Sequence, residues 1–186
     1  MDSDTSPGNA QRARPLPEFP ALARAAATLL RTPTALGELT ADDALCVASY
    51  MWAVAYNAGA TVMQAGESQH TGFMLLLLSG EVSVETQGTD ASVISVIGAG
   101  SLIGEMGLID GAPRSTNCLA VSRVEAGALT RAGLNRLIGE HPAVGARLMV
   151  AIAQRMAERL RAAGEQLHMV TQLLGDQQAE IARLKR

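Results

Sequence analysis

The chain has 186 residues, a net charge of −3 and only 3% aromatic residues. This length suits one substantial domain with an appended element rather than two full domains. The absence of a long basic tract and the scarcity of aromatic side chains exclude an evident nucleic-acid-binding surface.

The cysteines and apolar runs indicate a reducing compartment and no membrane anchor. Cys46 and Cys118 lack metal-ligand spacing and are predicted to be free thiols, and the histidines are too scattered for a metal site. The N-terminus is unlike a secretory signal, and the apolar run Phe73–Leu78 is too short to span a bilayer. We therefore expect a cytoplasmic protein without a metal or a membrane partner.

The N-terminal part predicts a tail and two helices. Residues 1–20 mix Ser, Pro, Gly and charged residues, which favours a flexible tail. Ala21–Arg31 is rich in alanine and leucine and predicts a helix. A second helix should begin after Thr40, which forms a plausible capping arrangement with Asp43.

From Trp52 onward, short apolar segments are divided by glycine turns. Many short strands at this rhythm predict an antiparallel sandwich or roll. The predicted strands are Trp52–Tyr56, Thr61–Gln64, Phe73–Ser79, Glu81–Thr86, Ser92–Ile97, Thr116–Val121 and Val124–Leu129.

The stretch from Gly98 to Thr116 carries the candidate chemistry. Its glycines bracket one carboxylate, Glu105, and one guanidinium, Arg114. Glycine lets the backbone approach a ligand, so N–H groups near Gly104 can point at an anion if a short helix begins there. Arg114 can grip a phosphate, whereas a carboxylate suits a donor such as a ribose hydroxyl. The alternative is a Glu105–Arg114 ion pair that closes a surface loop without a ligand.

The run from Gly104 to Leu108, followed by Pro113-Arg114-Ser115, resembles the phosphate-binding cassette of cyclic nucleotide-binding domains, including catabolite activator protein-like sensors. The resemblance implies that Arg114 and Ser115 hold the cyclic phosphate and that Glu105 holds the ribose 2′-hydroxyl. It also implies backbone contacts from Gly104 and Met106. Turn glycines extend the resemblance over about residues 39–160.

The C-terminal part predicts a short helix over Thr130–Gly139 and a second helix that Pro142 opens. Along the second helix, eleven positions follow one another at alternating steps of four and three residues, and ten of them are apolar. This pattern is typical of a coiled-coil seam and predicts a homodimer. Gln177 either fixes the register of the seam or is a polar residue that the seam tolerates. Gly175 could break the helix. The seam positions are Met149, Ala153, Met156, Leu160, Ala163, Leu167, Val170, Leu174, Gln177, Ile181 and Leu184.

In cyclic nucleotide-binding domains the helix after the roll closes over the base, and the resemblance aligns its base-contacting positions with Arg159 and Leu160. Arg159 could stack on the base or be an exposed flanking arginine. The ligand implied is cyclic AMP or cyclic GMP, with cyclic pyrimidine nucleotides as alternatives. No recognition helix comes after the seam, so we expect no direct DNA binding.

Together these features predict an α+β fold: an antiparallel, jelly-roll-like β-roll with N-terminal helices and a long C-terminal dimerisation helix. The expected parts are a tail over 1–20, the nucleotide-binding roll over 21–141 and the coiled coil over 142–186. We expect a stand-alone sensor that signals to an unidentified protein partner. No catalytic group or cofactor is suggested. The alternative is a scaffolding protein whose roll binds no ligand.

Overall fold

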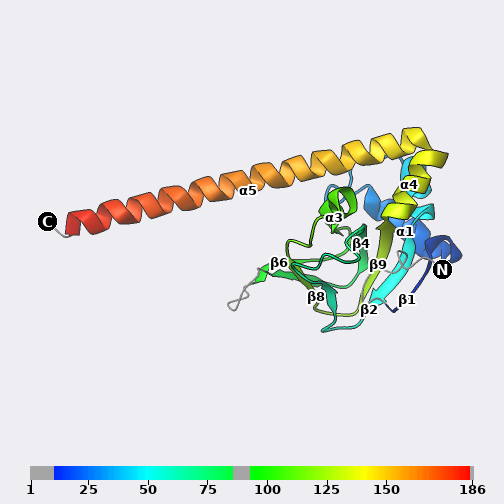
Figure 1. Cartoon of the computed structure of the whole chain (residues 1–186), viewed down its shortest axis with the longest axis horizontal. Helices are drawn as coiled ribbons and strands as arrows, with labels where there is room; N and C mark the ends of the chain where they lie inside the picture. The colour runs from blue at the N-terminus through cyan, green and yellow to red at the C-terminus, as the bar shows by residue number, and fades with distance from the viewer. Residues whose placement is uncertain (1–10, 86–92, 185–186) are drawn as a thin grey trace. The chain divides into compact units, whose positions relative to one another are not determined.

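The computed structural model describes residues 11–85 and 93–184 (Figure 1). The chain divides into a body that ends at Ala151 and a helical segment that begins at Ile152. Within the described residues, no helix combines the length and the apolar character needed to cross a bilayer.

The body contains two antiparallel sheets, as the segment pattern predicts. The first has the strand order β1-β2-β9-β4-β7 and the second β3-β8-β5-β6. Their bounds are β1 Gln11–Pro15, β2 Trp52–Tyr56, β3 Thr61–Met63, β4 Phe73–Ser79, β5 Val82–Glu85, β6 Val93–Ile97, β7 Leu102–Ile103, β8 Asn117–Ala120 and β9 Val124–Thr130.

Buried side chains from both sheets form one core. Strand β4 lies between β9 and β7, and its residues from Phe73 to Leu77 are all buried. A continuous apolar run of this kind is expected for a strand covered on both faces. Phe73 belongs to the core and Trp52 packs against it.

The expected tail over 1–20 is wrong for residues 11–20. Strand β1 pairs with β2, a 3-10 turn spans Leu16–Glu18, and helix α1 begins at Pro20. Leu16 is fully buried and its amide donates to the Met51 carbonyl. Prolines are compatible with an edge strand and with the first turn of a helix, so their number here does not indicate a mobile chain. Residues 1–10 lie outside the described residues.

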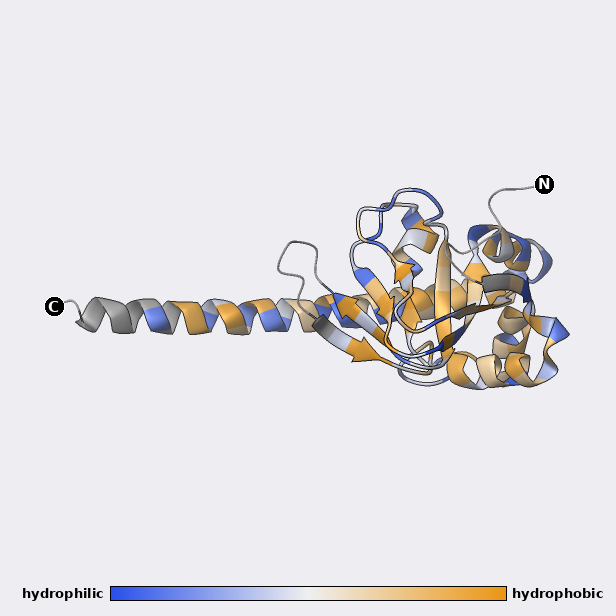
Figure 2. Cartoon of the chain, turned by 90° about the horizontal axis from the view of Figure 1, so that it is seen from below, coloured by the Kyte–Doolittle hydropathy of each residue, from blue (hydrophilic) through white to orange (hydrophobic). Residues whose placement is uncertain are grey.

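In the described part of the chain, five helices accompany the sheets: α1 Pro20–Leu30, α2 Ala41–Ser49, α3 Glu105–Asp110, α4 Arg131–Glu140 and α5 Pro142–Leu184. Helix α5 continues through Gly175 without a break. Figure 2 shows hydrophobic and hydrophilic residues alternating along it, as the heptad pattern requires.

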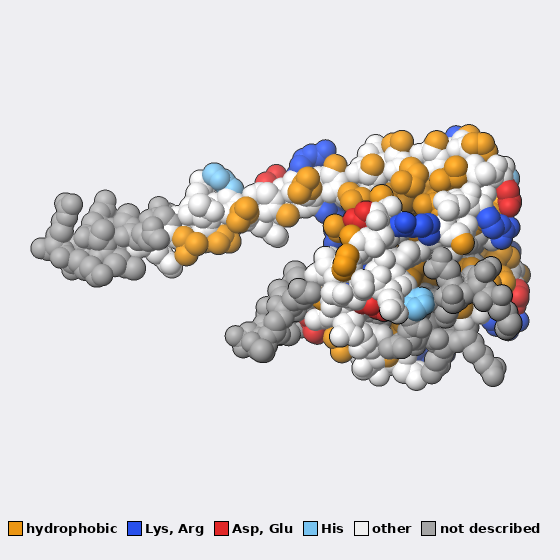
Figure 3. Space-filling model, in the orientation of Figure 1, with side chains coloured by type: hydrophobic (Ala, Val, Ile, Leu, Met, Phe, Trp, Pro, Cys, Tyr) orange, Lys and Arg blue, Asp and Glu red, His pale blue; other side chains and the backbone are white. Residues whose placement is uncertain are grey.

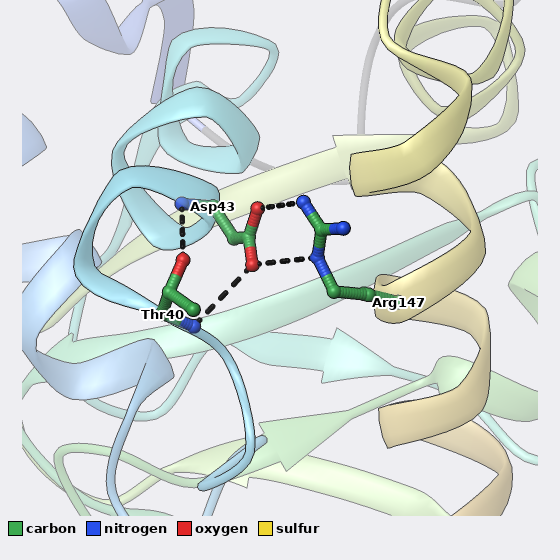
Figure 4. Close-up of polar contacts among 3 residues, drawn as sticks. All are labelled: Thr40, Asp43 and Arg147. Carbon is green, nitrogen blue, oxygen red and sulfur yellow. Dashed lines mark hydrogen bonds and ion pairs between the residues drawn. The ribbon is translucent and has the colours of Figure 1, made fainter.

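An ion pair joins α2 to the first turns of α5 (Figure 4). Thr40 and Asp43 form the predicted capping box at the start of α2. The buried Asp43 carboxylate also accepts from Arg147 Nη2 at 2.6 Å and Nε at 2.8 Å. The Arg147 hydrogen bond lowers the pKa of Asp43 from 3.8 to about 2.

We expect Asp43→Asn to lower the free energy of unfolding at pH 7 by about 1–2 kcal/mol, because the forked bond between the buried Asp43 carboxylate and the half-exposed Arg147 side chain loses its negative partner. The folded-state pKa is depressed, so this stability is present above about pH 4 and disappears as the pH falls through about 2. Chemical denaturation at several pH values measures the difference. Glu18→Gln, which breaks the exposed pair with Arg14, is the control and should change little. A wild-type advantage that is the same at pH 2 and pH 7 would contradict the assignment.

Candidate functional site

The short helix that the glycines predict at Gly104 is present as α3. Gly104 immediately precedes it with φ +79°, and Gly111 ends it with φ +70°. Both values lie in the left-handed region that glycine adopts without strain. The amide of Gly111 donates to the Gly107 carbonyl and closes the helix. Helix α3 is therefore a short, six-residue helix held between two glycines.

Arg114 lies under this helix with only 6% of its surface exposed. Its Nη1 donates to the Gly104 carbonyl and its Nη2 to the Phe73 carbonyl, both at 3.0 Å. The guanidinium carbon lies 4.4 Å from the centroid of the Phe73 ring. A guanidinium has five N–H donors, so these two bonds do not exhaust its capacity for an anion.

The backbone of Arg114 is held independently of its side chain. Its amide donates to the Glu67 carbonyl at 3.0 Å, and its carbonyl accepts from the Gly66 amide at 2.8 Å. These bonds pair the residue with the turn after β3. The position of Arg114 is thus fixed by main-chain contacts, and its side chain is directed toward α3.

The glycines of α3 make room for the guanidinium. A Cβ at Gly104 would lie 2.6 Å from Arg114 Nη1, and a Cβ at Gly107 would lie 2.8 Å from the same nitrogen. The Gly107 position is also blocked by the Thr71 carbonyl at 2.7 Å. The spacing of glycine and arginine in the sequence therefore reflects direct packing.

The pKa shifts of Arg114 and of nearby Tyr56 reflect the burial of this charge. Burial lowers the pKa of Arg114, and the nearby Glu67 carboxylate opposes that effect. Burial also raises the pKa of the Tyr56 hydroxyl, with the Arg114 charge acting against it. A buried cation whose bonds go to neutral carbonyls favours the approach of an anion.

The other predicted site residues fall into two groups. Glu105 is buried at the first position of α3, while Met106 beside it is about half exposed, at 48%. Ser115 is exposed directly after Arg114. Arg159 is exposed on α5 and belongs to the segment that begins at Ile152, outside the body that holds the other five. Within the described part of the chain, no group of three His, Cys, Asp or Glu residues is placed to hold a metal ion.

Residues 53–141 match the family model of the cyclic nucleotide-binding domain. The roll is a cyclic nucleotide-binding domain. The match confirms the family and the fold expected from the sequence, and it supports a regulatory role in cyclic nucleotide sensing.

Solved structures agree with this assignment. A cyclic nucleotide-binding domain from Methylobacillus flagellatus is 26% identical with a TM-score of 0.68, covering 78% of this chain and 82% of that one. The Thermus thermophilus catabolite activator protein is 27% identical with a TM-score of 0.63, covering 72% and 61%.

A curated relative extends the comparison to a regulator. The CRP-like cAMP-activated global transcriptional regulator of Mycobacterium tuberculosis is 24% identical over 100 residues, which are 53% of this chain and 44% of that protein. The chain thus spans less than half the length of the curated relatives that it matches.

Sequence reasoning missed three residues around the cassette of this cyclic nucleotide-binding domain. The carbonyl and the ring of Phe73 both contact Arg114. The Thr71 hydroxyl donates to the Gly111 carbonyl, and Arg131 donates to the Gly107 and Leu108 carbonyls. Of these three residues, only Arg131 carried a signal in the sequence. It is a cation in the first turn of a predicted helix, where the helix dipole disfavours a positive charge.

We expect Gly107→Ala to destabilise the domain by about 1–3 kcal/mol, because its methyl group would overlap the Thr71 carbonyl and the Arg114 guanidinium. Gly139→Ala is the matched control on α4, since a Cβ there meets nothing within 4 Å. That control should be neutral or stabilise by up to about 1 kcal/mol. Urea denaturation of the three proteins measures both effects, and equal stability of the two variants would contradict the packing account.

Proposed function

We propose that this protein is a regulatory sensor that binds a cyclic mononucleotide at Arg114 and α3, and that it forms a homodimer through α5. The observation that carries the proposal is the buried Arg114 guanidinium, enclosed by two glycines and bonded to carbonyl oxygens. A phosphate would add a negatively charged partner to the two neutral carbonyls that the guanidinium already contacts. The proposed contacts also include Ser115 beside the arginine.

The proposed role of Glu105 is to accept a hydrogen bond from the ribose 2′-hydroxyl. An ionised carboxylate only accepts, and the phosphate would repel it, so a sugar hydroxyl is its natural partner on this ligand. The amides of Gly104 and Met106 at the start of α3 complete the proposed set. Helix α3 has six residues, so its dipole is a minor contribution beside the Arg114 charge.

Cyclic AMP is the first ligand to test. The Mycobacterium tuberculosis relative is described as cAMP-activated. Arg159 is the proposed base contact from α5, by stacking or by a hydrogen bond. Because the base is read separately from the phosphate, cyclic GMP, CMP and UMP belong in the same comparison.

The proposed homodimer rests on the apolar stripe of α5. Leu160, Leu167, Val170 and Leu174 have the heptad spacing, and each exposes more than half of its surface. Figure 3 shows hydrophobic side chains gathered along this helical segment. A stripe of this length is unfavourable in water and is covered when a second copy supplies the same seam. We propose that nucleotide binding changes α5 and that a separate protein partner reads the change.

Arg114→Lys should weaken binding of the preferred cyclic nucleotide by about 10- to 100-fold, because lysine keeps the charge but cannot make the forked contact. Isothermal titration calorimetry against cyclic AMP, GMP, CMP and UMP measures the affinities. Arg123→Lys, at an exposed position of the same domain, is the control and should bind like the wild type. Thermal unfolding establishes that each variant is folded. A folded wild type that binds none of the four would favour the scaffolding alternative.

Leu167→Gln should shift the chain from dimer toward monomer by at least about tenfold in dissociation constant, because it places an amide in the proposed seam. Met169→Gln is the control, since Met169 is comparably exposed but lies outside the seam positions. Analytical ultracentrifugation over a concentration series measures both. Equal dissociation constants for the two variants would contradict the proposed seam.

A further inference from the structure

Arg131 occupies a position that its own helix does not favour. It is the first residue of α4, where the amide ends of a helix disfavour a positive charge. Its side chain instead reaches the C-terminal end of α3. Nη2 donates to the Gly107 carbonyl at 3.0 Å, and Nε donates to the Leu108 carbonyl at 3.1 Å. These carbonyls lie near the C-terminal end of α3, where a cation is favourable.

Two glycines pack against the side chain of Arg131. A Cβ at Gly111 would lie 3.3 Å from its Nη2, and a Cβ at Gly72 would lie 3.5 Å from its Cβ. The Arg131 amide donates to the Gly72 carbonyl at 2.7 Å. The buried Thr71 hydroxyl closes the group by donating to the Gly111 carbonyl at 3.1 Å. One arginine thus joins the chain before β4, the end of α3 and the start of α4.

The helical segment after Arg131 is firmly packed within the body. Leu137 of α4 and Leu148 in the first turns of α5 are fully buried. A Cβ at Gly145 would lie 2.7 Å from Ile138, so α4 and the beginning of α5 approach closely. Movement of α4 would therefore displace residues 142–151.

We propose that Arg131 is a positioning residue that couples α3 to α4 and so connects the nucleotide site to the helices beyond it. This inference rests on the proposed function for its ligand. The hydrogen bonds of Arg131 to α3, however, are present without a nucleotide. A nucleotide phosphate would bind at the Gly104 end of α3. Because Arg131 holds the opposite end by two bonds, a shift of α3 would be passed to α4 rather than absorbed by the loop after Gly111.

The test is amide hydrogen exchange on the full chain, with Arg131→Gln and Arg131→Lys compared with the wild type. Arg136→Gln is the matched control, because Arg136 lies on the same helix in an exposed pair with Glu140. Without nucleotide, Arg131→Gln should speed exchange over 107–111 by about tenfold, since charged hydrogen bonds to the helix end are lost. Arg131→Lys should restore part of the protection, and the control should match the wild type.

The second arm adds saturating cyclic AMP or cyclic GMP. In the wild type and in Arg136→Gln, nucleotide should slow exchange over both 105–111 and 131–151. In Arg131→Gln it should still slow 105–111 but lose most of its effect on 131–151, and Arg131→Lys should regain part of it. A wild-type response of 131–151 in Arg131→Gln, or unchanged ligand-free exchange over 107–111, would overturn the inference.

The two proposals fail in different ways. Absence of nucleotide binding by the wild type in calorimetry refutes the proposed ligand, and the ligand-free arm then decides whether Arg131 holds α3. Binding by the wild type with an unaltered α4 response in Arg131→Gln refutes the coupling alone. If Arg131→Gln does not fold, the same comparisons are made with Arg131→Lys, which keeps the charge but lacks the planar fork of the guanidinium.

Discussion

The structure of the cassette depends on one buried charge, the guanidinium of Arg114. Removing it from water is costly, and its hydrogen bonds to the Gly104 and Phe73 carbonyls offset only part of that cost. The glycines of α3, the ring of Phe73 and the turn at Glu67 are all arranged around it. A protein that only needed a closed loop would gain little from such a group, whereas an anion-binding protein obtains a preformed site.

Two arginines hold α3, one at each end. Arg114 contacts the Gly104 end and Arg131 the carbonyls of Gly107 and Leu108. Each arginine comes from a different part of the chain, and each packs where a glycine leaves out a side chain. A six-residue helix with little stability of its own is therefore positioned by neighbours. Such an element can respond to a ligand while it stays attached to the structure around it.

Local patterns in the sequence were sufficient for much of the fold. Strands β2 and β4 arise from apolar runs between turns, and the Thr40 capping box starts α2 as predicted. Strand β1 was missed because prolines dominate its surroundings, although an edge strand accepts them. Strand β7 has two residues, too few for any periodicity.

For the site, the spacing of the glycines and Arg114 was informative because close packing between them imposes it. It predicted the group around Arg114 but not the carbonyls that receive the guanidinium, of which the Phe73 carbonyl comes from β4 and is invisible to spacing. The contact of Arg131 with α3 joins residues 23 and 24 positions apart. Long-range hydrogen bonds to backbone atoms leave no residue pattern, so only the structure reveals them.

The most direct measurement of the central claim is the side-chain Nε–H spectrum of the arginines by NMR during titration with cyclic AMP and cyclic GMP. The Arg114 signal is assigned by its loss in Arg114→Lys, and adenosine, which lacks the phosphate, is the control ligand. If Arg114 holds the phosphate, a cyclic nucleotide shifts the Arg114 signal and adenosine does not. An Arg114 signal that stays unchanged while nucleotide binds would place the phosphate elsewhere and contradict the account.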